Sequence, residues 1–103
     1  MVKISKENDK IVRISTTVEN NSAIICIVDN GGGINDKIID KIFEPYFTTK
    51  HQSQGTGIGL YMSHEIIIKH FKGNITASNV EFEYKDKTYN GAKFKIELPL
   101  NEL

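Results

Sequence analysis

The chain has 103 residues, and its 13 basic and 13 acidic residues cancel to a formal net charge of +0. This length fits one small domain that buries roughly 60–70% of its unfolded surface, and the balanced charge gives no electrostatic basis for a broad nucleic-acid or anionic-membrane surface. With no apolar run near the ~20 residues of a membrane span, no secretion signal at Met1-Val2-Lys3 and a single cysteine, the composition favours a soluble cytoplasmic module without a disulfide or a transition-metal site.

Residues 1–10 are polar and show no clear periodicity, so they are read either as a frayed helix end or as an extended arm. From Ile11 to Val18 apolar and polar residues alternate, which predicts a half-buried strand. A turn cluster, Glu19-Asn20-Asn21-Ser22, separates this strand from the β-branched run Ala23–Val28, which suits an interior strand. We expect the two strands to form a hairpin, with Cys26 as a buried and inert thiol.

The segment Asp29-Asn30-Gly31-Gly32-Gly33-Ile34 ends that second strand abruptly. Consecutive glycines raise the entropy cost of folding, so a sequence tolerates them mainly where the backbone must turn or approach another group. The residues alone leave two interpretations open: a strand-end turn in which Asp29 bonds its own backbone, and a ligand-binding turn. Asn35 or Asp36 then predicts the start of a short helix, which should end before Pro45.

Three aromatic residues surround a proline in Phe43-Glu44-Pro45-Tyr46-Phe47, and the polar stretch Thr48–Gln54 follows. In one interpretation the aromatic side chains complete the core beside an ordinary exposed loop. In the other, the polar stretch is a lid that orders over a ligand. The two are compatible, because the aromatic residues can anchor one end of a segment whose remainder moves.

Alternating glycines mark the segment Gly55-Thr56-Gly57-Ile58-Gly59-Leu60, and an apolar helical pattern begins immediately behind it. Glycine lets a backbone approach a ligand closely, and a helix that opens there directs unpaired N–H groups toward it. The segment lacks the Gly-Lys-Ser/Thr ending of a mononucleotide P-loop and the glycine spacing of the dinucleotide fingerprint. A phosphate-binding turn and an ordinary tight turn therefore both remain open.

The second half of the chain predicts one helix and two strands. Residues 58–71 carry apolar side chains at helical spacing, with Leu60, Ile67 and Phe71 along one stripe, and Gly73 should end this helix. For the histidines on or near the stripe, a packed role is favoured over a catalytic one. Strands follow over residues 75–84 and 92–98, and the last one ends at Pro99.

The predicted order is thus β-β-α-loop-α-β-β, an α+β fold in the form of a two-layer α/β sandwich. Its sheet would be mixed or antiparallel, with helices on one face. Short connections between successive elements should bring Asp29–Gly33, the polar stretch and Gly55–Gly59 to a common rim.

These segments together resemble the ATP-binding catalytic domain of sensor histidine kinases of two-component systems. Asp29–Gly33 is similar to the family's first glycine box, Phe43–Lys50 to its phenylalanine box and Gly55–Leu60 to its second glycine box, while Gly91-Ala92-Lys93-Phe94 resembles its last strand. The resemblance covers roughly residues 11–100. It implies a Bergerat-type ATP-binding fold, which type II topoisomerases such as DNA gyrase, the Hsp90 chaperones and the MutL proteins share.

The resemblance also implies roles for individual residues. Asp29 would accept a hydrogen bond from the adenine amino group, and Gly31 and Gly33 would let the backbone approach the base and sugar. The second glycine box would offer amides to the phosphates, and Lys50 would contact the terminal phosphate as the one candidate catalytic group. The implied cofactor-binding positions are Asp29, Gly31, Gly33, Ile34, Phe43, Thr49, Lys50, Gly55, Thr56, Gly57, Ile58, Gly59 and Leu60.

One departure from the family concerns magnesium. The family places a further helix, with a magnesium-binding asparagine, before the first strands, and the surroundings of Asn8 do not recreate that motif. Residues 1–10 are therefore interpreted as an N-terminal remnant, and residues 11–103 as a partial ATP-binding domain that lacks its first helix and any metal ligand of its own. Apolar sheet surface left uncovered in this way predicts a homo-oligomer.

The function implied is that of a module whose parent transfers the γ-phosphoryl group of ATP to a histidine on a separate dimerisation domain, and then to a response regulator. ATP and magnesium are the implied cofactors, and this piece alone is expected to be inactive. Two alternatives stay open: a folding or interaction unit that binds no nucleotide, and a non-kinase ATPase of the same fold. The implied location is cytoplasmic, with the attachment of the parent to a membrane left open.

Overall fold

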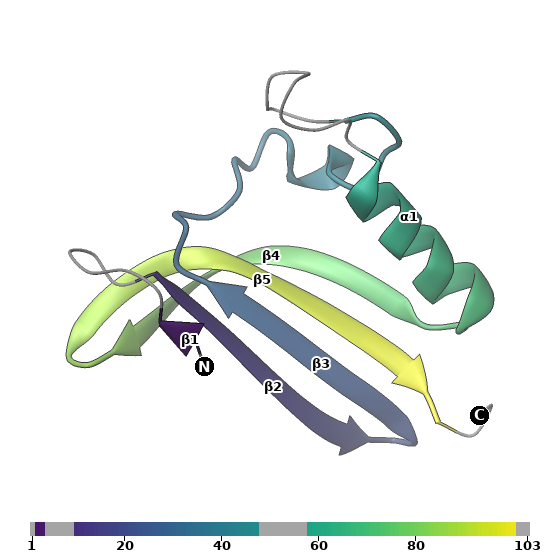
Figure 1. The fold of residues 1–103 in the computed structure, drawn as a ribbon, viewed down its shortest axis with the longest axis horizontal. Coiled ribbons are helices and arrows are strands. Elements are labelled where there is room, and N and C mark those ends of the chain that lie inside the picture. Colours follow the sequence, from purple (N-terminus) through teal and green to yellow (C-terminus); the bar gives the residue numbers. More distant parts are fainter. Residues whose placement is uncertain (1, 4–9, 48–57, 101–103) are drawn as a thin grey trace.

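The computed structural model of the chain describes residues 2–3, 10–47 and 58–100, which form one sheet with helical segments on one face (Figure 1). The sheet has five strands in the order β1-β2-β3-β5-β4, and every neighbouring pair is antiparallel. The predicted two-layer α+β architecture is confirmed, and the sheet is antiparallel rather than mixed. The elements are β1 (Val2–Lys3), β2 (Ile11–Glu19), β3 (Ser22–Asp29), η1 (Ile39–Lys41), α1 (Gly59–Glu65), η3 (Ile66–His70), β4 (Asn74–Tyr84) and β5 (Lys87–Pro99).

Both hairpins turn on two residues with left-handed backbone conformations. The pairing of Glu19 with Ser22 leaves Asn20 and Asn21 as the turn, with φ of 52° and 63°. In the same way Lys85 and Asp86, with φ of 50° and 65°, connect β4 to β5. Positive φ at both central residues is the signature of a type I′ turn, whose twist matches that of the flanking strands. The turn cluster predicted before Ala23 therefore sets the register of the first hairpin.

The antiparallel pairings fix the direction of the helical layer. Strands β3 and β4 both run antiparallel to β5, so they run parallel to each other with β5 between them. The chain must therefore return along the sheet between the end of β3 and the start of β4, and α1 with η3 makes this return (Figure 1). Consequently α1 points its first turn toward the end of the sheet where β3 stops at Asp29, and its last turn toward the start of β4.

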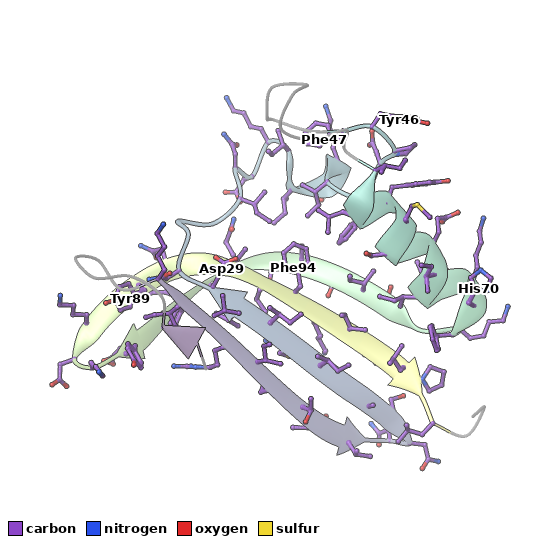
Figure 2. All side chains as sticks on the ribbon, viewed as in Figure 1. Asp29, Tyr46, Phe47, His70, Tyr89 and Phe94 are labelled. Atoms are coloured by element: carbon purple, nitrogen blue, oxygen red, sulfur yellow. The ribbon has the colours of Figure 1, made fainter. Side chains whose placement is uncertain are left out.

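The core between the two layers is built on aromatic and aliphatic side chains. The ring of Phe43 lies 5.1 Å from that of His64 on α1 and 6.3 Å from that of Phe94 on β5, the second pair edge-to-face. Figure 2 shows Phe94 beneath the helical layer. Aromatic pairs at these separations are favourable beyond the area that they bury. Phe43 thus anchors its segment to both layers, whereas Tyr46 is 74% exposed, so the core interpretation holds for Phe43 and not for Tyr46.

The predicted apolar stripe on the helix is wrong in its phase. Leu60 is 39% exposed and Phe71 46% exposed, whereas Tyr61 and His64 are half-buried. Two features contribute to the difference in the second half of the helix. The isoleucine run 66–68 is compatible with more than one helical face, and residues 66–70 form a π-helix, which holds more residues per turn than the α-helical spacing assumes.

The helix ends at a residue in the left-handed conformation, one position earlier than predicted. Lys72 has the left-handed conformation, with φ of 58°, and the N–H of Gly73 donates to the carbonyl of Ile67 at 2.9 Å. Gly73 is needed for a different reason, because a Cβ there would lie 2.0 Å from the carbonyl oxygen of Glu97. Gly73 therefore allows the end of the helix to approach β5 closely, and it is Lys72 that makes the turn.

Three further expectations concern the segment after Asn35, the N-terminal residues and membrane-spanning helices. The short helix predicted after Asn35 is reduced to turns and the single 3-10 turn η1, with the Asn35 side chain accepting from the Lys37 N–H at 2.8 Å. Residues 2–3 pair with β2, so this part of the N-terminal segment is extended. No helix among residues 2–3, 10–47 and 58–100 is long and apolar enough to cross a membrane.

Candidate functional site

The carboxylate of Asp29 organises the end of β3. Its Oδ1 accepts a hydrogen bond from the N–H of Gly31 at 2.9 Å and another from the N–H of Ala92 on β5 at 3.2 Å. The strand-end turn anticipated from the sequence is therefore present, with the added contact across to β5. The side chain is half-buried at the rim of the sheet, where Figure 2 shows it below the ascending loop. Two donors hold the carboxylate in one orientation.

The glycine run that follows Asp29 uses conformations that other residues rarely adopt. Gly32 and Gly33 have φ of 94° and 89°, and the Gly32 N–H donates to the carbonyl of Asn90 at 3.1 Å. A side chain at Gly33 would also place its Cβ 2.7 Å from Oδ1 of Asn79. Backbone geometry and space therefore both require glycine at position 33.

Gly91 on β5 lies directly against the end of β3. A Cβ at this position would be 1.6 Å from the carbonyl oxygen of Asp29 and 2.5 Å from its carbonyl carbon. The absence of a side chain is what lets β5 approach Asp29 closely enough for Ala92 to donate to its carboxylate. The sequence marked Gly91 only through the family resemblance, because its contact partner is remote along the chain.

Asn79 on β4 is a site residue that the sequence did not reveal. Its Oδ1 accepts from the Ile34 N–H at 2.6 Å, and its Nδ2 donates to the Ile34 carbonyl at 2.7 Å and to Oδ1 of Asp36 at 3.1 Å. In the sequence, Asn79 looks like one more polar residue of an alternating strand. Only the register of the sheet shows that it faces the loop after Asp29.

An open hollow of about 420 Å³ adjoins this loop. It belongs to the rim beside the glycine run, but Asp29 itself does not line it. Its lining residues come from the loop and from the β4–β5 hairpin: Gly32, Asn79, Val80, Glu81, Asn90 and Gly91.

The start of α1 is the second part of the candidate site. The carbonyl of Ile58 accepts from the Met62 N–H at 2.9 Å, so Gly59, Leu60 and Tyr61 are first-turn residues whose N–H groups have no carbonyl partner within the helix. A Cβ at Gly59 would meet nothing within 4 Å, which leaves the backbone open there. Tyr46 and Phe47 lie near this end of the helix (Figure 2).

Some of the predicted site residues are described by the structure and the others are not. Asp29, Gly31, Gly33 and Ile34 lie in one continuous segment at the end of β3, and Ile58, Gly59 and Leu60 open α1, which points its first turn toward that end of the sheet. Phe43 connects the helical layer to the sheet through its ring contacts. The remaining candidates lie outside the described residues: Thr49, Lys50, Gly55, Thr56 and Gly57.

One ion pair dominates the electrostatics of the helix surface. Lys69 Nζ lies 2.8 Å from Oε1 of Glu65, and this hydrogen bond lowers the pKa of Glu65 and raises that of Lys69. Lys69 is exposed and Glu65 is half-buried, and the two opposite charges stabilise each other on the helix surface. Within the described part of the chain, no group of three or more His, Cys, Asp or Glu side chains could hold a metal ion.

Comparisons with known proteins point to one family. The family model described as histidine kinase-, DNA gyrase B-, and HSP90-like ATPase matches residues 1–102. The two-component sensor PprA of Pseudomonas aeruginosa is 43% identical over 72 residues, which are 70% of this chain and 7% of PprA. The signal transduction histidine-protein kinase AtoS of Escherichia coli (strain K12) is 40% identical over 91 residues, which are 87% of this chain and 13% of AtoS.

A solved structure gives the same picture. The catalytic domain of the histidine kinase ThkA, in a nucleotide-free form, matches with a TM-score of 0.69 and 31% identity, over 85% of this chain and 52% of that one. The chain therefore spans less than a fifth of these two curated relatives and about half of the solved catalytic domain.

Proposed function

Because the chain belongs to the family of histidine kinase-, DNA gyrase B- and HSP90-like ATPases, we propose that it is the ATP-binding catalytic domain of a two-component sensor histidine kinase. The observation that supports this proposal is the direction of the helix over the sheet. The carboxylate of Asp29 lies where β3 stops, and α1 points its first turn toward that end of the sheet. A single elongated nucleotide can bridge them.

In the proposed complex the base binds at the end of β3. Asp29 accepts a hydrogen bond from the adenine amino group, and the turn through Gly31 and Gly33 passes beside the base and sugar without side chains in the way. The support for this is that the two donors to the carboxylate among the described residues, the N–H groups of Gly31 and Ala92, both use Oδ1. The base amino group then takes the other carboxylate oxygen.

The phosphates bind at the start of α1 in this proposal. The N–H groups around Ile58, Gly59 and Leu60, with those of Gly55, Thr56 and Gly57, bind the phosphate oxygens. Thr49 and Lys50 contact the terminal phosphate, where a positive charge helps to neutralise the phosphoryl group as it leaves. In the parent protein, that group passes to a histidine of a dimerisation domain and then to a response regulator.

Magnesium accompanies ATP in phosphoryl-transfer enzymes, where it bridges the phosphates. Among the described residues no group of three or more His, Cys, Asp or Glu side chains could hold this ion. Asn8, the asparagine that the sequence offered, lies outside the described residues. We therefore assign no step of the reaction to a metal ligand of this chain.

The proposal is tested by calorimetric titration of the chain with ATP and, separately, with GTP. An adenine-reading carboxylate predicts saturable ATP binding and much weaker GTP binding, because the guanine carbonyl oxygen would face the carboxylate of Asp29. Equal affinities would refute the adenine assignment, and no binding of either nucleotide would refute the function for this chain.

A second candidate, an interaction unit, is favoured by one observation on β2. Ile14 is 57% exposed and Val18 69% exposed on the face of the sheet that carries α1, because the helix lies toward β4 (Figure 1). Exposed apolar side chains on one face of a strand favour association with another protein surface. We expect light scattering to show a dimer or larger assembly that the double substitution Ile14→Ser, Val18→Thr shifts to monomer, while a monomer at high concentration before substitution would contradict it.

A further inference from the structure

The side chain of Asn79 pairs with the Ile34 peptide as a neighbouring strand would. Its amide accepts from the N–H of Ile34 and donates to the carbonyl of the same residue, at 2.6 and 2.7 Å, and the second Nδ2 hydrogen reaches the Asp36 carboxylate at 3.1 Å. Both backbone polar groups of Ile34 and the nearby Asp36 side chain are thus held by a single residue. An amide is the one short side chain that offers an acceptor and two donors for this purpose.

The pairing with Ile34 is connected to Asp29 through the sheet. Asn79 is the register partner of Ala92, and the N–H of Ala92 donates to the Asp29 carboxylate. Paired residues on antiparallel strands present their side chains on the same face, so Asn79 reaches the loop from the side of the sheet on which Asp29 acts. The loop between them contains Gly32 and Gly33, both at positive φ, and glycine has little intrinsic preference for one backbone conformation because it lacks a Cβ.

We propose that Asn79 is a positioning residue for the nucleotide site, which holds the loop from Gly31 to Ile34 in its binding conformation before the nucleotide arrives. This inference rests on the proposed function. Without the Asn79 contacts, the glycine loop samples other conformations, and a ligand must order it on binding. The apparent affinity then falls in proportion to the fraction of molecules that are already competent.

The matched pair of variants is Asn79→Ala and Ser78→Ala. Both side chains are exposed on β4, but Ser78 points to the opposite face of the sheet, so its loss should leave the loop unchanged. We expect ATP affinity, measured by calorimetry, to fall about 5- to 30-fold in Asn79→Ala, as expected for the loss of two or three hydrogen bonds. Ser78→Ala should bind as the unchanged chain does.

A spectroscopic readout separates positioning from a general loss of stability. In Asn79→Ala, amide hydrogen exchange of Ile34 should accelerate in the free protein and slow again when ATP is added, while that of Ile25 on β3 stays constant. Asn79→Asp provides a second variant, since it keeps the acceptor for the Ile34 N–H but places a carboxylate against the Ile34 carbonyl and Asp36. Its affinity should fall at least as far.

The outcomes distinguish this inference from the function on which it rests. If the unchanged chain binds ATP and Asn79→Ala binds it equally well, the positioning role is overturned and the proposed function stands. If the unchanged chain binds no ATP, both fail. Unaltered exchange of Ile34 in Asn79→Ala would overturn the role by itself, because the loop would then hold its conformation without Asn79.

Discussion

Replacing Asp29 with alanine is expected to weaken ATP binding by about 1.5–3 kcal/mol, the usual contribution of a hydrogen bond to a charged group. This corresponds to roughly a 10- to 150-fold higher Kd. The carboxylate is the only group in the proposed complex that distinguishes adenine from other bases by direct contact. Calorimetric titration of the variant beside the unchanged chain measures the difference, and an unchanged Kd would refute the adenine assignment.

The alanine variant also loses an acceptor that the fold uses, because the N–H groups of Gly31 and Ala92 both donate to Asp29. Asp29→Asn separates the two roles. The asparagine side chain keeps one oxygen for these internal donors and presents an amino group to the adenine amino group, so two donors face each other. We expect Asp29→Asn to unfold at a denaturant concentration close to that of the unchanged chain and yet to bind ATP weakly.

Replacing Gly91 with valine is expected to cost about 3 kcal/mol of folding stability or more. The first atom of the new side chain would lie 1.6 Å from the carbonyl oxygen of Asp29 and 3.0 Å from the Cα of Asn30. These atoms belong to the backbone, so no side-chain rotation can relieve the overlap and β3 must separate from β5. Overpacking of an interior usually costs 1–3 kcal/mol, and a backbone clash lies at the upper end of that range.

Gly59→Ala is the matched control for this prediction, because a Cβ at Gly59 meets no atom within 4 Å. Alanine is also the better helix former, so its stability should be unchanged or slightly increased. Urea denaturation followed by circular dichroism measures both variants. A Gly91→Val variant with the midpoint of the unchanged chain would show that β5 does not approach Asp29 as closely as the structure indicates.

Much of the fold could be predicted from the sequence because it depends on local patterns. Alternation from Ile11 to Val18 and the β-branched run after Ala23 predicted β2 and β3, and the asparagine pair between them suited the type I′ turn that was found. The helix after Gly59 and the two strands behind it were also predicted. The ordered glycine and phenylalanine boxes predicted the family, which the match over residues 1–102 confirms.

The features that escaped prediction depend on contacts between residues far apart in the chain. Asn79 bonds Ile34, which lies 45 residues away, and its role appears only once the sheet register brings β4 beneath the loop. Gly73 and Gly91 looked like turn or motif glycines, but each is required by the backbone of another strand. The helix phase also escaped prediction, and toward the end of the helix the π-helical residues 66–70 change the spacing on which the prediction relied.

The most direct test of the account is an ATP titration followed through the backbone amide resonances of the chain. If Asp29 and the start of α1 bind opposite ends of one nucleotide, the amides of Gly31 and Ile34 and those of Gly59 and Leu60 should shift together with a single Kd. Adenosine, which lacks the phosphates, should shift only the first pair. An ATP titration that moves one pair alone, or the two pairs with different affinities, would contradict the account.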